Sequence, residues 1–263
     1  MPHTIRDESC YMAPLQLAGR LIMENGGETY RVEETITRMG QALGLEGVES
    51  FAVPSGVFVT YRRSDGAYET AVIRVRKAST NLARVDEVND VSRRLEAGEV
   101  TFEEVCALLQ AIADAPPPNS KLMVMLATTV SSGGFTVMFG GGVIEFAVAA
   151  FSALAAQLLT VLMQRRRLQG LVTVLAGAVT SAFLPMLFNY LTGLCVVDAT
   201  VAGALMPLLP GLAMTIAVQD TLRGDMVSGI SHGFSAALTA VMVAGGALLA
   251  ASLMSIVRGG AAL

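Results

Sequence analysis

The 263-residue chain divides into two halves of very different charge. Residues 1–120 contain 12 lysines and arginines against 18 aspartates and glutamates, a net charge of −6, whereas residues 121–263 contain only 6 and 4. An acidic first half offers no basic face to nucleic acid, so nucleic acid is not expected as a partner. The nearly uncharged second half, in a chain that is 53% hydrophobic, indicates a lipid bilayer as its surroundings.

The cysteines and the N-terminus indicate where the first half of the chain resides. Cys10, Cys106 and Cys195 have neither the CxxC nor the Cys/His spacing of a zinc site, and an odd number of cysteines does not suggest a disulfide framework. A reduced cytosolic setting fits this pattern. Residues 1–20 are polar and acidic before they become amphipathic, so they lack the pattern of a signal peptide.

The first half of the chain is predicted to fold as an α+β domain over residues 1–114. Helical spacing of apolar residues predicts helices in 11–45, where Asn25-Gly26-Gly27 breaks the pattern into two, and in 81–95 and 101–112. Short β-favouring runs separated by turns predict a three-stranded meander at 49–53, 56–61 and 68–76. Thr101 followed by Glu104 predicts a capping box at the start of the last helix.

A proline-rich linker at 115–120 separates this domain from a membrane domain at 121–263. Three consecutive prolines, Pro116 to Pro118, end the preceding helix because proline cannot donate a backbone hydrogen bond and disfavours helix before it. Five long apolar stretches follow, at 122–144, 146–163, 168–190, 199–219 and 228–257. Each is close to or above the ~18 residues that a spanning helix needs. The predicted fold is a membrane α-helical bundle of about five transmembrane helices with an N-terminal α+β cytosolic domain.

The loop charges predict the orientation of the spans. Arg165, Arg166 and Arg167 lie between the second and third stretches, with Lys121 and Arg223 on the same side, and only Arg258 on the opposite side. The positive-inside rule therefore places the N-terminal domain in the cytoplasm. The expected location of the spans is a bacterial-type inner membrane.

The fourth apolar stretch is the most informative for function, because Pro207, Pro210 and Gly211 interrupt it. A broken helix in lipid frees backbone groups that protein, water or a ligand must satisfy, and transporters build substrate sites from such breaks. The alternative is a kink that neighbouring helices relieve.

Small polar residues in the first apolar stretch have a similar pair of interpretations. Ser131, Ser132 and Gly133 either line a pathway or allow two helices to approach closely. Among the few ionisable residues near the bilayer, Asp220 follows the broken helix, and His232 is either a proton relay or a solvated residue near the inner boundary.

Catalysis has little support in the sequence. The histidines are His3, near the N-terminus, and His232, and their spacing to serine, aspartate, glutamate and cysteine assembles neither a catalytic triad nor a metal site. No catalytic residue, metal or cofactor is therefore predicted.

Two motifs resemble the threonine/serine exporter family. One is Gly26 to Glu33, read GGETYRVE, and the other is Leu208-Leu209-Pro210-Gly211 followed by Asp220, Gly224-Asp225 and Ser228-Gly229. The resemblance covers about residues 15–251. The family includes a split branch, associated with dicarboxylate export, in which a large subunit pairs with a small membrane subunit. This chain is similar to the large subunit, which implies such a partner, a homo-oligomer, or both.

The resemblance implies a secondary-type exporter of amino acids such as threonine and serine, or of dicarboxylates such as succinate, driven by an ion gradient, with the proton as the expected ion. The expected substrate-binding residues are Ser131, Ser132, Gly133, Pro207, Pro210, Gly211 and Asp220. Glu28, Tyr30, Arg31 and Glu33 are candidates for a gate or sensor at the cytosolic mouth, with a helix cap and surface ion pair as the simpler alternative. The competing function is a membrane-anchored cytosolic enzyme or metabolite sensor.

Overall fold

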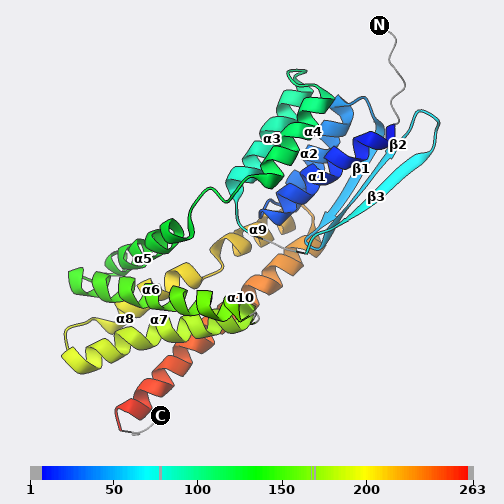
Figure 1. The fold of residues 1–263 in the computed structure, drawn as a ribbon. Helices are drawn as coiled ribbons and strands as arrows, with labels where there is room; N and C mark the ends of the chain where they lie inside the picture. The colour runs from blue at the N-terminus through cyan, green and yellow to red at the C-terminus, as the bar shows by residue number, and fades with distance from the viewer. Residues whose placement is uncertain (1–7, 77–78, 167, 169, 260–263) are drawn as a thin grey trace. The chain divides into compact units, whose positions relative to one another are not determined.

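The computed structural model describes residues 8–76, 79–166, 168 and 170–259 (Figure 1). His3 and Arg167, both used in the sequence analysis, lie outside these ranges. The chain forms two compact units. The first comprises residues 1–116 together with 214–233, and the second comprises 117–213 together with 234–263.

The N-terminal stretch of the first unit folds into helices and a small antiparallel sheet (Figure 1). After a short 3-10 helix, η1 (Glu8–Tyr11), the helices are α1 (Met12–Glu24), α2 (Thr29–Ala42), α3 (Leu82–Glu96) and α4 (Phe102–Asp114). The strands are β1 (Glu46–Val53), β2 (Gly56–Arg62) and β3 (Tyr68–Arg74), paired in the order β1-β2-β3. The predicted helices and the predicted meander are therefore confirmed.

Alternating burial on the central strand explains how the sheet packs. Val57, Val59 and Tyr61 of β2 are fully buried and join the apolar core that α1 and α2 supply. The predicted turn between α1 and α2 is present, with Gly26 at φ +82°, a conformation that glycine adopts without a steric penalty. The predicted capping box is also confirmed, since the Thr101 amide donates to Glu104 Oε2 at 2.7 Å and the Glu104 amide donates to Thr101 Oγ1 at 3.4 Å.

The chain returns to the first unit long after the predicted cytosolic domain has ended. Most of α9 (Gly211–Leu222), the turn that follows it, and the start of α10 (Met226–Val257) belong to this unit. The buried side chain of Asp220 in α9 contacts Thr29 at the start of α2. Two stretches almost 200 residues apart in sequence therefore share one packed body.

The second unit is built from helices α5 (Lys121–Met138), α6 (Val143–Arg165), α7 (Gly170–Thr192) and α8 (Val197–Leu205), the 3-10 turn η2 (Met206–Leu208), and the remainder of α10. Helices α5, α6, α7 and α10 are long and apolar enough to cross a membrane. The bent pair formed by α8 with η2 and α9 gives a fifth candidate if it is one span. The described part of the chain thus has four to five candidate spans, and the predicted number of about five falls within this range.

Close helix packing in the second unit depends on glycine. A Cβ atom at Gly203 of α8 would lie 2.6 Å from the Thr136 backbone nitrogen and 2.7 Å from its Cα. A Cβ at Gly246 of α10 would lie 2.6 Å from the Ala178 Cβ. These approaches bring α8 against α5, and α10 against α7, as small residues allow between membrane helices.

The first apolar stretch ends earlier than predicted. Helix α5 stops at Met138 instead of continuing to residue 144, and Gly140, at φ +89°, lies in the turn that leads into α6. Hydropathy alone places the end of this helix too late because the turn residues are as apolar as the helix itself.

Candidate functional site

The second unit contains a pocket of about 310 Å³ that is lined by uncharged residues, and we call it the polar pocket for its hydroxyl and amide groups. These polar residues are Thr128 of α5, Gln157, Thr160 and Gln164 of α6, and Ser181 of α7. The rest of the lining is apolar and includes Pro207 and Leu208 of the broken-helix segment.

Ser181 is the most unusual residue of the polar pocket. This residue is 1% exposed, and among the described residues its hydroxyl oxygen has no hydrogen-bond partner. Pro185, four residues later in α7, has no N–H and cannot donate to the Ser181 carbonyl as a helix normally requires. Because a buried, unpartnered polar group is costly, these two groups are suited to receive a ligand.

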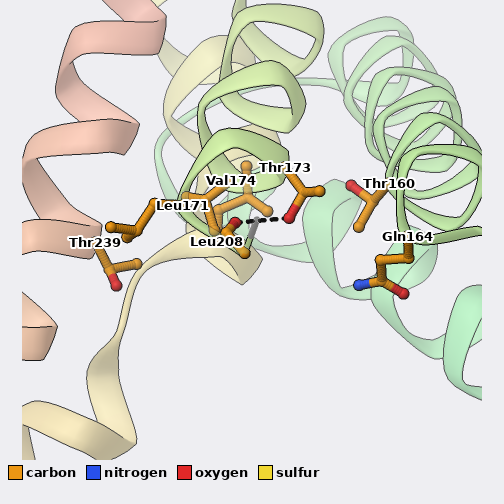
Figure 2. Close-up of a pocket in the computed structure, with 8 residues that line it drawn as sticks. Thr160, Gln164, Leu171, Thr173, Val174, Leu208 and Thr239 are labelled. Carbon is orange, nitrogen blue, oxygen red and sulfur yellow. Dashed lines mark hydrogen bonds between the residues drawn. The ribbon is translucent and has the colours of Figure 1, made fainter. Parts of the chain in front are cut away.

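A second, larger pocket of about 620 Å³ shares Thr160, Gln164 and Leu208 with the polar pocket. Figure 2 shows the hydroxyl of Thr173 in this pocket donating to the Gly170 carbonyl, at 2.6 Å, and Thr239 of α10 on the opposite side. Two of the shared residues, Thr160 and Gln164, lie on α6 and contribute a hydroxyl and an amide to both pockets, whereas Leu208 of η2 is apolar.

The predicted residues of the broken helix differ in whether they line the polar pocket. Pro207 lines the polar pocket, and because it has no N–H it cannot donate to the Gly203 carbonyl. The Gly211 amide donates to the Leu209 carbonyl at 2.9 Å across the break. Pro210 and Gly211 form the break but are not among the residues that line the polar pocket.

The three predicted residues of α5 lie near the polar pocket but do not line it. Ser131 is exposed, and the buried Ser132 hydroxyl donates to the Thr128 carbonyl at 3.0 Å. A Cβ at Gly133 would lie 2.6 Å from the Phe146 ring, so this glycine allows α5 and α6 to approach. Thr128, which does line the polar pocket, is in the same helix, one turn before Ser132.

Sequence reasoning did not select Gln157 or Gln164, and it includes Ser181 only in a general way, as one of several hydroxyls that could form a polar seam without fixed charge. Amides and hydroxyls in an apolar helix are common, and their helix faces become meaningful only when the neighbouring helices are known. The signal in the sequence that points to Ser181 is Pro185, four residues later, because proline leaves the Ser181 carbonyl without its helical donor.

A buried carboxylate in the first unit forms a second cluster of predicted residues. Asp220 is fully buried, and its Oδ2 lies 2.9 Å from His232 Nδ1 and 3.5 Å from the Thr29 hydroxyl. Its Oδ1 has no hydrogen-bond partner. His232 is thus in contact with an acidic residue and is not simply a solvated edge residue.

The predicted gate residues lie at the start of α2, on either side of Thr29, which contacts this carboxylate. The guanidinium carbon of Arg223 lies 3.5 Å from the centroid of the Tyr30 ring, a cation–π contact. Arg31 Nε donates to Glu28 Oε2 at 2.7 Å. Burial raises the pKa of Glu28, but hydrogen bonds and the charges of Arg31 and Arg223 outweigh it and hold the pKa below its usual value.

Two further carboxylates complete the cluster. Burial raises the pKa of Glu33, the hydrogen bond from the Ala52 amide opposes this, and repulsion from Asp225 adds to the rise. Burial and repulsion from Asp220 raise the pKa of Asp225, against the attraction of Arg223. The side of α2 that faces the α9–α10 turn is therefore rich in negative charge.

We expect Asp225→Asn to raise the melting temperature by a small amount at pH 7. The folded-state pKa of Asp225 lies above its unfolded-state value, so folding opposes its ionisation at neutral pH. Below about pH 3 the side chain is protonated in both states, and the gain should vanish. Thermal unfolding of both proteins at the two pH values measures this, and an equal gain at both would contradict a charge effect.

Among the described residues, no group of three or more histidine, cysteine, aspartate or glutamate side chains could hold a metal ion.

Comparison with known proteins identifies one family. Residues 15–254 match the model of a family described as "Putative threonine/serine exporter". No match was found among curated proteins or among solved structures.

Proposed function

We propose that this chain, which belongs to the threonine/serine exporter family, exports small zwitterionic amino acids such as threonine and serine across a membrane. The observation that carries this proposal is the polar pocket, where the buried Ser181 hydroxyl has no partner within the protein. A substrate hydroxyl, ammonium or carboxylate group would satisfy it.

The charge of the polar pocket favours amino acids over dicarboxylates. Its lining residues include amides and hydroxyls but no lysine or arginine. An anion moved from water into a site without a countercharge loses several kcal/mol of solvation, whereas a zwitterion enters with no net charge. Succinate, which the resemblance also implied, is therefore the less favoured substrate.

The broken helix supports the proposal that this segment binds substrate in addition to bending the chain. Pro207 leaves the Gly203 carbonyl without its helical donor beside the polar pocket. The C-terminal end of α8 also carries a partial negative charge, which suits a substrate ammonium group. We assign this end of α8 to the ammonium side of the substrate.

The remaining parts of the proposal concern the membrane and the partner. The basic residues Lys121, Arg165 and Arg223 support an orientation with the N-terminal domain in the cytoplasm of a bacterial-type inner membrane. The buried pair of Asp220 and His232 supports the proton as the coupling ion. A role as the large subunit, with a small membrane subunit or a second copy as partner, rests on the resemblance to the split branch.

Efflux from vesicles tests the function. Vesicles that contain the chain, alone and with a small-subunit partner, are preloaded with labelled threonine, serine or succinate. We expect efflux of threonine or serine above that of empty vesicles and little efflux of succinate. Efflux of succinate alone would move the chain to the dicarboxylate branch. No efflux of any substrate with the partner present would favour the anchored enzyme or sensor.

A further inference from the structure

We infer that Asp220 and His232 form the proton-binding site of the exporter, and that the N-terminal domain is a working part of this site through Thr29. The inference rests on the proposed function and identifies the groups through which a proton gradient would act. These three side chains belong to one packed unit, although they are far apart in the sequence.

The contact between the two residues joins His232 Nδ1 and Asp220 Oδ2 at 2.9 Å. When the carboxylate is ionised it only accepts, so in that state the hydrogen is on His232 Nδ1 and is donated to Asp220 Oδ2. The Thr29 hydroxyl donates weakly to the same oxygen at 3.5 Å. Asp220 Oδ1 accepts nothing, although it is fully buried.

A purely structural role explains this arrangement poorly. A buried ion pair stabilises a protein only when its remaining hydrogen-bonding positions are satisfied, and an unsatisfied charged group costs more than a neutral one. Oδ1 therefore leaves the buried charge of Asp220 only partly compensated. A positive charge on His232 would compensate it in place.

The difference in exposure gives the proton a route to solvent. The His232 side chain is 24% exposed, whereas the Asp220 side chain is 0% exposed. A hydronium ion gives its proton to Nε2 of His232 and leaves as water, and the pair changes from a net charge of −1 to 0. Its release restores the charge of −1, and no other bond is formed or broken. Histidine is suited to this step because it exchanges protons near neutral pH.

Charged groups lie on both elements that pack against the pair. Helix α2 presents Tyr30 and Glu33 beside Thr29, and Glu28 at its start is paired with Arg31. The α9–α10 turn presents Arg223 and Asp225, and Arg223 lies over the Tyr30 ring. Once the Glu28–Arg31 pair is set aside, Asp220, Asp225 and Glu33 outnumber the single arginine.

The test separates the proton-driven reaction from substrate exchange. Full-length protein in proteoliposomes is assayed with labelled threonine for efflux driven by a pH gradient, and for exchange of internal against external threonine at equal pH. We expect Asp220→Asn to slow driven efflux at least tenfold and to retain at least half of the exchange rate. His232→Gln should likewise slow driven efflux and retain most of the exchange rate. Asp198→Asn, which alters an exposed carboxylate of α8, is the matched control and should retain both activities.

Each outcome decides the inference. If Asp220→Asn retains driven efflux, the pair does not carry the proton. If Asp220→Asn elutes as a folded protein but loses exchange as well, Asp220 serves the substrate or the fold, and the inference is overturned. If Asp220→Asn does not fold, the same criteria apply to His232→Gln, which removes a partly exposed side chain. Absence of both activities in the wild type would instead contradict the proposed function.

Discussion

Ser181→Ala should slow threonine efflux by about 10- to 100-fold without destabilising the protein. A hydrogen bond to a charged group contributes about 1.5–3 kcal/mol, and every 1.4 kcal/mol changes affinity tenfold. The Ser181 hydroxyl has no partner within the protein, so its removal costs the fold nothing and removes a buried unsatisfied group. Most substitutions that impair function by damaging the fold lower both the efflux rate and the stability. Ser181→Ala should lower the efflux rate alone.

The matched control for this prediction is Ser152→Ala. Ser152 is also a fully buried serine in the second unit, but its hydroxyl donates to the Val148 carbonyl at 2.7 Å and does not line the polar pocket. We expect Ser152→Ala to keep an efflux rate within about twofold of the wild type, because no substrate contact is lost. The dependence of efflux on threonine concentration measures both variants. Equal losses in the two would indicate that the polar pocket is not the substrate site.

Gly203→Ala should lower the melting temperature of the membrane unit by about 5 °C or more, because overpacking costs about 1–3 kcal/mol and a kcal/mol is worth several degrees. The added Cβ would meet the backbone nitrogen and Cα of Thr136 at 2.6 and 2.7 Å. Backbone atoms in the middle of a helix cannot rotate away as a side chain can. Helices α5 and α8 would therefore have to separate.

Gly134→Ala provides the control within the same pair of helices. A Cβ at Gly134 of α5 has no neighbouring atom within 4 Å, so we expect no fall in the melting temperature. The chain has no tryptophan, but Cys195 is buried in the second unit. Once Cys10 and Cys106, which are free and only partly buried, are replaced by serine, the reaction of Cys195 with a thiol-reactive dye on heating reports unfolding of this unit. An equal fall in both glycine variants would contradict a role for the contact between α5 and α8, because helix propensity by itself favours alanine over glycine.

Local patterns in the sequence determined most of the secondary structure. The Thr101–Glu104 cap, the Asn25-Gly26-Gly27 turn and the three strands depend on residues that are near one another in the chain, so spacing was sufficient to predict them. The break at Pro207 and Pro210 was predicted for the same reason, since proline removes helical hydrogen bonds wherever it stands.

Only the tertiary structure decided which polar residues act together. The sequence indicated polar residues in α5, but the residue of this helix that lines the polar pocket is Thr128, and not Ser131, Ser132 or Gly133. The positions of α6 and α7 determine which side of α5 faces the pocket. Asp220 was predicted to bind substrate beside the broken helix, and it packs against Thr29 with His232 as its partner. Contacts across almost 200 residues leave no periodic trace in a single sequence. The sequence by itself therefore determined the elements and the membrane character, whereas packing between elements determined the two candidate sites.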